Sequence, residues 1–471
     1  MRDNDYRKDR EEMKELLKQF TNLREGKAHS FIEEDGFERI IEYYDEREDH
    51  ATALEASNLA IEIYPYSSSL QIKKADLLIV SRLYEEALAI LEKAEILDRS
   101  DINLYILKTD VYLALDQQQK AAALLEEAIY MFTGEERIEL LFELADVYDD
   151  YEEFDKVFNC LRLILEQDPN NEEALYKICF WTDFTGRNEE GIKLHNKIIE
   201  FNPFNELAWF NLGAAFQGIK LYEKAVDAYL YALAIDEKFD YAYRNLGDAY
   251  LRLRKYKDAI EVLQKVLELT RPEDVVYEAI GHCFDKLKNY AQARFNYRKA
   301  SHLSPEDSHL HYKIACTYMN EGHWDSAIKS LEAAMRIKRS DADYNFALAK
   351  CYMELNSVKE AVIYFSAFIK ARPKNIRGWK ELIICLYHAG YFEEALEQVD
   401  NAEKNIKRPL LNYYKAAILF QLGKTKEALI ILETALQKSP KLLKQLIELN
   451  PSLLQKQQVV DLIARHKKYR S

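Results

Sequence analysis

Histidine and cysteine side chains gather in one stretch of the C-terminal half, where their chemistry could hold a metal ion. The residues are His282, Cys283, His309, His311 and Cys316. Imidazole and thiolate are ligands that Zn²⁺ prefers, but zinc sites use characteristic spacings such as paired CxxC motifs. The spacing of these five residues matches no such pattern, so we predict no metal site.

The six cysteines of the chain form no CxxC pair. They are Cys160, Cys179, Cys283, Cys316, Cys351 and Cys385. Free cysteine behaves as a small hydrophobic side chain in protein interiors. We therefore interpret the cysteines as buried free thiols.

Common catalytic motifs are absent from the sequence. It contains no GxxxxGK[ST], no GxGxxG after a strand, no HExxH and no GxSxG. Single carboxylates, histidines and serines are frequent, but no spacing joins them into a catalytic set. We predict that the protein is not an enzyme and uses no cofactor.

A small residue recurs along the chain with a nearly constant period. Nine of its eleven intervals are 34 residues, one is 36 and one is 33. The positions are Ala53, Ala87, Ala121, Val157, Gly191, Ala225, Ala259, Ala293, Ala327, Ala361, Ala395 and Ala428. Within each period, apolar residues at spacings of three and four predict two amphipathic helices of about 12–15 residues. A period of this length predicts an array of stacked helical hairpins.

The best copy of the repeat shows which other residues recur with the same period. Its residues are Trp209, Leu212, Gly213, Phe216, Ala225, Tyr229 and Ala232. This pattern resembles the tetratricopeptide repeat, and twelve copies start near residues 34, 68, 102, 138, 172, 206, 240, 274, 308, 342, 376 and 409. The resemblance implies an all-α, right-handed superhelical solenoid of about twelve helix–turn–helix repeats with terminal capping helices. Small residues such as Gly213 should let one helix cross its neighbour closely.

The second copy departs from the pattern, because Gln71 and Lys74 stand where an aromatic residue and leucine are expected.

Three segments follow from this layout. Residues 1–33 form a charged N-terminal capping helix or arm, residues 34–442 the solenoid, and residues 443–471 a capping helix with the basic tail Arg465-His-Lys-Lys-Tyr-Arg470. The charged N-terminus does not resemble a signal peptide, and no apolar run approaches 18 residues. We therefore expect a cytoplasmic protein that does not insert into membranes.

Charge is distributed unevenly along the chain. Residues 1–205 carry 47 Asp and Glu against 24 Lys and Arg, whereas residues 206–471 carry 33 against 41. Such an asymmetry indicates which charge a binding partner carries and how electrostatic attraction steers its approach, although an acidic surface can also simply keep a protein soluble. The acidic first half would repel phosphate, so we predict no nucleic-acid partner.

The resemblance implies that the first helix of each repeat lines a concave groove, so residues on that face are candidates for binding. The acidic candidates are Asp146 and Asp149, and the basic candidates are Arg244, Lys350, Arg377 and Lys380. The aromatic candidates are Tyr176, Phe180, Phe184, Phe210 and Tyr241. These rings either pack against the neighbouring repeat or anchor an interface. Asn211 and Asn245 occupy equivalent places, and the resemblance suggests that their amides hold a peptide backbone.

Together these features predict a non-enzymatic scaffold or adaptor that binds an extended protein or peptide segment in its groove. A basic segment of the partner would meet the N-terminal repeats and an acidic segment the C-terminal repeats. One alternative is an assembly adaptor that uses its convex face or its termini. Another is a co-chaperone-like client binder, although the carboxylate clamp of such relatives is not found in the sequence.

Overall fold

The computed structural model describes residues 2–27 and 31–468, and this part of the chain contains helices and no strands. Two compact units are present, residues 1–242 and residues 243–471, and the boundary falls within one helix, α14 (Asp240–Arg252).

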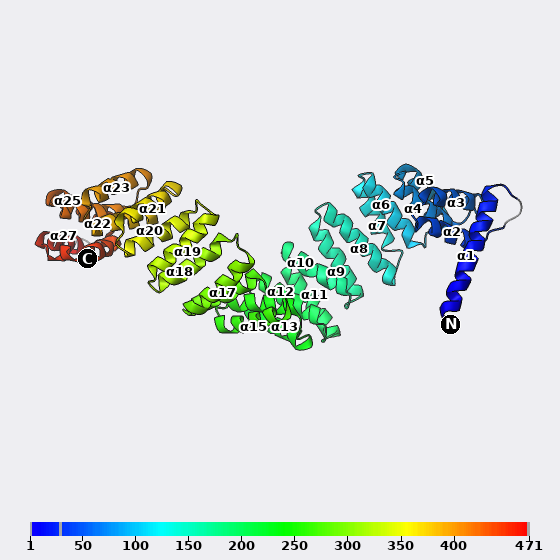
Figure 1. Cartoon of the computed structure of the whole chain (residues 1–471), viewed down its shortest axis with the longest axis horizontal. Helices are drawn as coiled ribbons and strands as arrows, with labels where there is room; N and C mark the ends of the chain where they lie inside the picture. The colour runs from blue at the N-terminus through cyan, green and yellow to red at the C-terminus, as the bar shows by residue number, and fades with distance from the viewer. Residues whose placement is uncertain (1, 28–30, 469–471) are drawn as a thin grey trace. The chain divides into compact units, whose positions relative to one another are not determined.

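The first unit contains the helices of the N-terminal half (Figure 1, blue to green). They are α1 (Arg2–Arg24), α2 (Glu34–Asp45), α3 (His50–Ile63), α4 (Ser68–Val80), α5 (Tyr84–Leu97), α6 (Ile102–Ala114), α7 (Gln118–Ala128), α8 (Gly134–Asp150), α9 (Phe154–Gln167), α10 (Glu172–Phe184), α11 (Asn188–Phe201), α12 (Glu206–Gly218) and α13 (Tyr222–Ile235). Each helix packs against the next, as expected for stacked hairpins.

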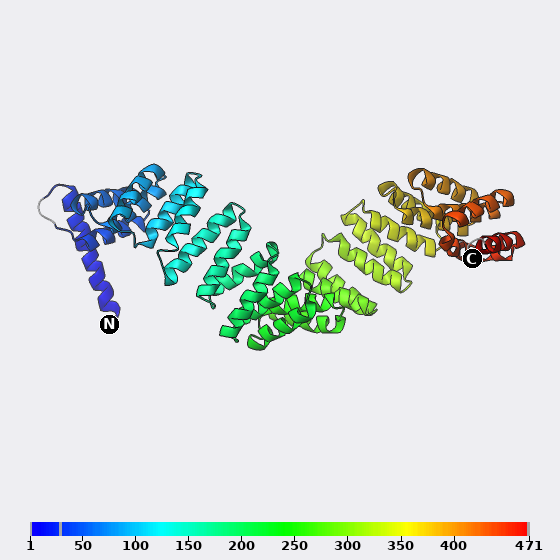
Figure 2. The same cartoon turned by 180° about the vertical axis from the view of Figure 1, so that it is seen from behind.

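The second unit continues the same pattern, and Figure 2 shows its helix pairs from behind. Its helices are α15 (Tyr256–Leu269), α16 (Asp274–Lys286), α17 (Tyr290–Leu303), α18 (Ser308–Asn320), α19 (Trp324–Ile337), α20 (Ala342–Glu354), α21 (Val358–Ala371), α22 (Ile376–His388), α23 (Phe392–Asn405), α24 (Pro409–Gln421), α25 (Thr425–Lys438), α26 (Leu443–Leu449) and α27 (Gln457–Lys468). Two short 3₁₀ helices, η1 (Pro440–Leu442) and η2 (Pro451–Gln455), flank α26.

Helices α2 to α25 form twelve pairs, one for each predicted repeat, in which an even-numbered first helix precedes an odd-numbered second helix. The periodic small residue lies on the second helix. Its alanines are fully buried in every copy that has one, and Val157 is 3% exposed. The prediction that this position permits close helix packing is confirmed.

Glycine at the crossing point of two helices also permits close helix packing. A Cβ atom added to Gly213 would lie 2.5 Å from Cε1 of Tyr229, and one added to Gly281 would lie 2.7 Å from Cδ1 of Tyr297. No side chain fits at such a distance without moving the ring. The two helices of these repeats can therefore pack this closely because glycine stands there.

The turn between the two helices of every repeat places one residue in the left-handed region, with φ between 57° and 81°. The twelve residues are Glu48, Arg82, Asp116, Glu152, Gly186, Lys220, Arg254, Lys288, Gly322, Asn356, Gly390 and Gly423. This conformation costs a non-glycine residue about 1–2 kcal/mol, and eight of the twelve are not glycine. The packing of the helix pair therefore imposes the turn on residues that do not favour it.

One hydrogen bond accounts for the glutamine in the irregular second repeat. Trp209 donates from Nε1 to the carbonyl oxygen of Pro203 at 2.9 Å, which ties the first helix to the preceding loop. Gln71 stands at the equivalent place and donates from Nε2 to the carbonyl oxygen of Pro65 at 3.0 Å. The amide thus replaces the indole in the same contact.

Additional helices cover the outermost repeat of each unit. Phe20 of α1 is 1% exposed and belongs to the core that α1 forms with α2 and α3. In the second unit Val459 of α27 is 1% exposed, and Asn450 donates to the hydroxyl of Tyr387 at 2.7 Å. The basic tail predicted from the sequence extends to Arg470, and residues 469–471 lie outside the described residues.

Candidate functional site

Three aromatic rings project from one face of α10 in the first unit. Tyr176, Phe180 and Phe184 follow at intervals of four residues, so they share a face of the helix. They are 59%, 59% and 56% exposed, and the rings of Phe180 and Phe184 stack with centroids 5.6 Å apart. We call these three residues the aromatic surface.

The opposite face of α10 explains why the rings point outward. Ala174, Leu175 and Ile178 are fully buried, and they fix the rotation of the helix. The helix begins at an asparagine cap, where Oδ1 of Asn171 accepts a hydrogen bond from the Ala174 backbone at 2.9 Å. Core packing thus holds the aromatic surface toward solvent.

Two further rings, which the repeat pattern of the sequence does not single out, support the aromatic surface. Phe154 at the start of α9 stacks on Trp181 at 5.3 Å and meets Phe184 edge-on at 4.9 Å. An aromatic residue begins the second helix in several repeats, so Phe154 looks like an ordinary repeat residue in the sequence. Its contact with α10 could be recognised only from the packing of adjacent repeats.

Phe210 and Tyr241 lie near this surface but differ in exposure. Phe210 is half-buried, and its ring centroid lies 5.0 Å from that of Phe239, directly before α14, and 5.8 Å from that of Tyr229 on α13, so it packs against neighbouring side chains. Tyr241 is 60% exposed. The pKa of Tyr176 is raised by partial burial and then by nearby acidic groups, with a further contribution from Tyr241, so these two rings lie within electrostatic range.

A row of carboxylates precedes the aromatic surface along the first helices. The row consists of Glu42 on α2, Asp76 on α4, Asp110 on α6 and Asp146 on α8, all at the same repeat position and all accessible to solvent in part. Phe180 occupies that position in the next repeat. Equivalent positions of stacked repeats face the same side, so the carboxylate row leads to the aromatic surface. Asp149 is also exposed on α8.

Acidic groups around the row raise one another's pKa. Partial burial and then the charge of Asp45 raise the pKa of Asp76, and partial burial followed by Asp76 raises the pKa of Asp110. The pKa of Glu143 on α8 is raised by burial and then by Asp110 and other carboxylates. A cation bound along the row would relieve this repulsion.

Lysines of the chain already offset part of the charge. Lys73 binds Glu42 at 2.5 Å, and Nζ of Lys177 lies 3.7 Å from Asp146.

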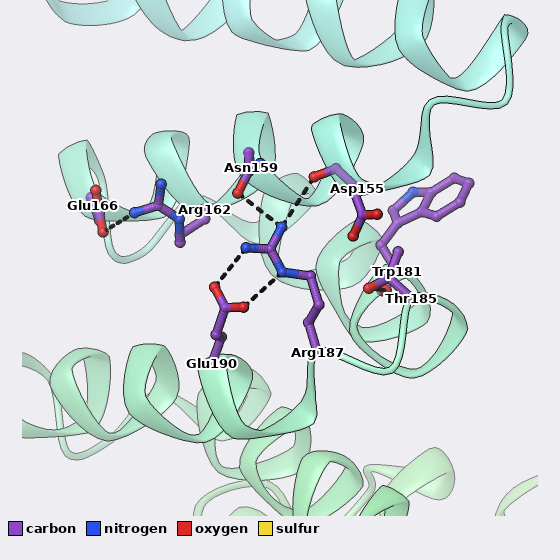
Figure 3. A network of polar contacts seen from close by, with 8 residues as sticks. All are labelled: Asp155, Asn159, Arg162, Glu166, Trp181, Thr185, Arg187 and Glu190. Atoms are coloured by element: carbon purple, nitrogen blue, oxygen red, sulfur yellow. Dashed lines mark hydrogen bonds and ion pairs between the residues drawn. The ribbon is translucent and has the colours of Figure 1, made fainter.

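Arg187, at the N-terminal end of α11, anchors the repeat that carries the aromatic surface (Figure 3). Its guanidinium donates to both carboxylate oxygens of Glu190, at 2.9 and 2.6 Å, and to Oδ1 of Asn159 on α9 at 2.9 Å. It also donates to the carbonyl oxygen of Asp155 at 3.1 Å and lies 4.4 Å from the ring centre of Phe158. These contacts tie α11 to the preceding repeat.

The two asparagines occupy different environments. Asn211 is 3% exposed, and its Nδ2 donates to the carbonyl oxygen of Leu175 at 2.7 Å, so this amide joins α12 to α10. Asn245 on α14 is half-buried. The bond engages one hydrogen of the Asn211 amide, and the burial of the side chain keeps the rest of the amide from a peptide on the surface.

Several predicted cations of the second unit have intramolecular partners. Arg244 makes a bidentate pair with Glu273, at 2.7 and 2.8 Å.

Lys350 lies 3.5 Å from Glu381, and the guanidinium of Arg377 lies 4.2 Å above the ring centre of Phe346. Lys380 is half-buried, and no carboxylate of the described chain pairs with it or with Arg377.

The histidine and cysteine residues do not converge on one point. Among residues 2–27 and 31–468, no group of three or more potential His, Cys, Asp or Glu ligands could hold a metal ion. All six cysteines are free, and four of them are buried, as predicted, while Cys179 and Cys316 are half-buried. Burial raises the pKa of Cys283 to about 11 and that of Cys160 to about 12, so both are protonated thiols at neutral pH.

Within the same described residues, no helix is both long enough and apolar enough to span a membrane.

Comparison with known families decides the class of repeat. A tetratricopeptide-repeat model matches residues 342–375, which begin at the same residue as the tenth predicted copy, and the model of the tetratricopeptide repeat protein 21 C-terminal ARM domain matches residues 224–345. The chain is a tetratricopeptide-repeat protein.

Similar proteins cover parts of this tetratricopeptide-repeat protein. A peroxisomal targeting signal receptor from Kluyveromyces lactis is 29% identical over 99 residues, which are 21% of this chain and 18% of the receptor. The structure of YrrB, described as a TPR protein with an unusual peptide-binding site, is 21% identical, with a TM-score of 0.35, and covers 39% of this chain and 95% of its own. The APC/C hetero-tetramer Cut9-Hcn1 is 14% identical, with a TM-score of 0.35, and covers 82% of this chain and 90% of that one.

Proposed function

We propose that this tetratricopeptide-repeat protein is a scaffold that binds an extended segment of another protein along the first helices of repeats one to five. The observation that supports the proposal is the aromatic surface, with three rings more than half exposed, at the end of the carboxylate row. Basic residues of the partner would pair with the row, and its apolar side chains would cover the rings.

The two parts of the surface would contribute differently. Each well-buried apolar side chain contributes about 1.5–3 kcal/mol, and the energy of an interface concentrates in a few such anchors. Exposed carboxylates contribute less to affinity but accelerate encounter and set the orientation of a basic partner. Loss of the rings should therefore weaken binding more than loss of any single carboxylate.

The second unit offers less support for an acidic segment of the same partner. Arg377 and Lys380 remain available there, whereas Arg244 and Lys350 have carboxylate partners.

Selection from a random peptide library displayed on phage tests the proposal directly. The full-length protein is compared with the variant Phe180→Ala/Phe184→Ala, and Phe204→Ala is the matched control, because Phe204 is 78% exposed and lies in the loop between α11 and α12. The wild type and the control should enrich peptides in which Lys or Arg residues flank apolar residues, and the double variant should lose them. Equal enrichment by all three proteins, or peptides without basic residues, would refute the proposal.

A further inference from the structure

The second helix of the eighth repeat, α17, has an unusual composition. Among the twelve second helices of the described chain, it is the one without an Asp or Glu residue. It carries Arg294, Arg298 and Lys299 instead. Because the other second helices all contain acidic residues, this one presents a local excess of positive charge.

A hollow of about 610 Å³ lies beside this charge. It is lined by Ala291, Gln292, Arg294, Phe295 and Arg298 of α17 and by Tyr318 of α18. The ring of Phe295 borders the hollow and is 54% exposed, so it offers the hollow an accessible apolar side. The hollow therefore combines an apolar wall with cationic side chains.

The two arginines of the hollow differ in whether a carboxylate pairs with them. Arg294 is 13% exposed, pairs with Glu321 and lies 4.3 Å from the ring centre of Tyr318, so its charge is balanced. Arg298 is exposed and donates to the hydroxyl of Tyr318 at 2.8 Å, and no carboxylate pairs with it in the described part of the chain. Its charge therefore has no carboxylate beside it, and its guanidinium has further N–H groups that can donate to an acidic partner.

We propose that this hollow docks an acidic segment of another protein that also carries an apolar side chain. A carboxylate of the segment would form charge-assisted hydrogen bonds with Arg298, and the apolar side chain would pack against Phe295 in the hollow. The surface is separate from the one under the proposed function, because it lies in the other unit and takes a partner of opposite charge.

Fluorescence anisotropy with a labelled synthetic peptide of the pattern Glu-Glu-Phe-Glu-Glu-Leu tests the proposal on the full-length chain. We expect Arg298→Glu to weaken binding about tenfold or more, because it removes the charge-assisted hydrogen bonds and places a like charge against the acidic peptide. Phe295→Ala should weaken it as well. Lys359→Glu is the matched control, since Lys359 is an exposed lysine on α21, two repeats away, and its reversal should leave the affinity within about twofold.

Three results would overturn the proposal: no binding of this peptide to the wild type, equal loss in Arg298→Glu and Lys359→Glu, or undiminished affinity for a peptide in which Ala replaces both apolar residues. Sedimentation without peptide distinguishes the remaining occupant. A wild-type dimer that Arg298→Glu dissociates would show that a second copy of this chain, not a foreign segment, covers the hollow.

Discussion

Replacing His195 by leucine should change how the stability of the protein depends on pH. His195 lies on α11 with its side chain fully buried, and neither ring nitrogen has a hydrogen-bond partner among the described residues. Burial lowers the pKa of its imidazole from about 6.5 to about 3, because the charged form cannot be solvated there. Other repeats hold mostly leucine or an aromatic residue at this position, namely Leu91, Leu125, Leu161, Tyr229, Leu263, Tyr297, Leu331, Phe365 and Leu432.

The magnitude follows from proton linkage. The unfolded chain binds a proton at His195 below about pH 6.5, whereas the folded chain does not bind one until about pH 3. Above pH 6.5 the titration of His195 therefore costs the fold no stability. As the pH falls from 6.5 toward 3, this residue lowers the free energy of unfolding progressively. At about pH 5 this one residue should lower the free energy of unfolding by about 2 kcal/mol relative to neutral pH.

Urea denaturation of the wild type and of His195→Leu, at about pH 7.5 and about pH 5, measures this difference. The variant should lose about 2 kcal/mol less on acidification and should be the more stable protein at both values, since it also removes two unpaired buried nitrogens. His302→Leu, at an exposed histidine on α17, is the control and should retain the wild-type dependence on pH. If His195→Leu lost as much stability on acidification as the wild type, His195 would not be the buried neutral group described.

Three further predictions concern the repeats themselves. Asp110→Asn should raise the free energy of unfolding at neutral pH, because the raised pKa of Asp110 means that its ionised form disfavours the fold; denaturation at acidic pH, where the carboxyl is protonated, should show no such gain. Gly213→Ala should cost about 1–3 kcal/mol in thermal unfolding, since the new methyl meets the ring of Tyr229, and an unchanged melting temperature would contradict the packing described. Arg187→Ala should cost about 1–3 kcal/mol and speed hydrogen exchange in α11, and unaltered exchange there would rule out its anchoring contacts.

The sequence predicted the fold well because every repeat restates the same pattern. The small residue on the second helix and the apolar spacing recur twelve times, so an irregular copy does not obscure the period. The left-handed residue in each turn was not foreseen, because most copies have Arg, Lys, Asp, Glu or Asn there. Local preference gives little signal where the packing of two helices imposes the conformation.

The candidate site was only partly predictable. The exposed rings of Phe180 and Phe184 could be assigned to one helix face from their spacing, because that face is fixed by the buried residues opposite. The supporting ring of Phe154 could not be assigned to this surface from the sequence, since it comes from the preceding repeat. Whether Asn211 offers its amide to a partner or to α10 also depends on a neighbouring helix, and the sequence gives no sign of the bond to Leu175.

By itself, the amino-acid sequence determined the repeat, its helices, its buried face and the uneven distribution of charge, because these depend on local spacing and composition. The tertiary structure alone decided which charges are available, for example that Arg244 is paired and Arg298 has no carboxylate partner in the described chain. Ion pairs such as Arg244–Glu273 and ring contacts such as Phe154–Trp181 join side chains of neighbouring helices. Their geometry exists only once the repeats have stacked.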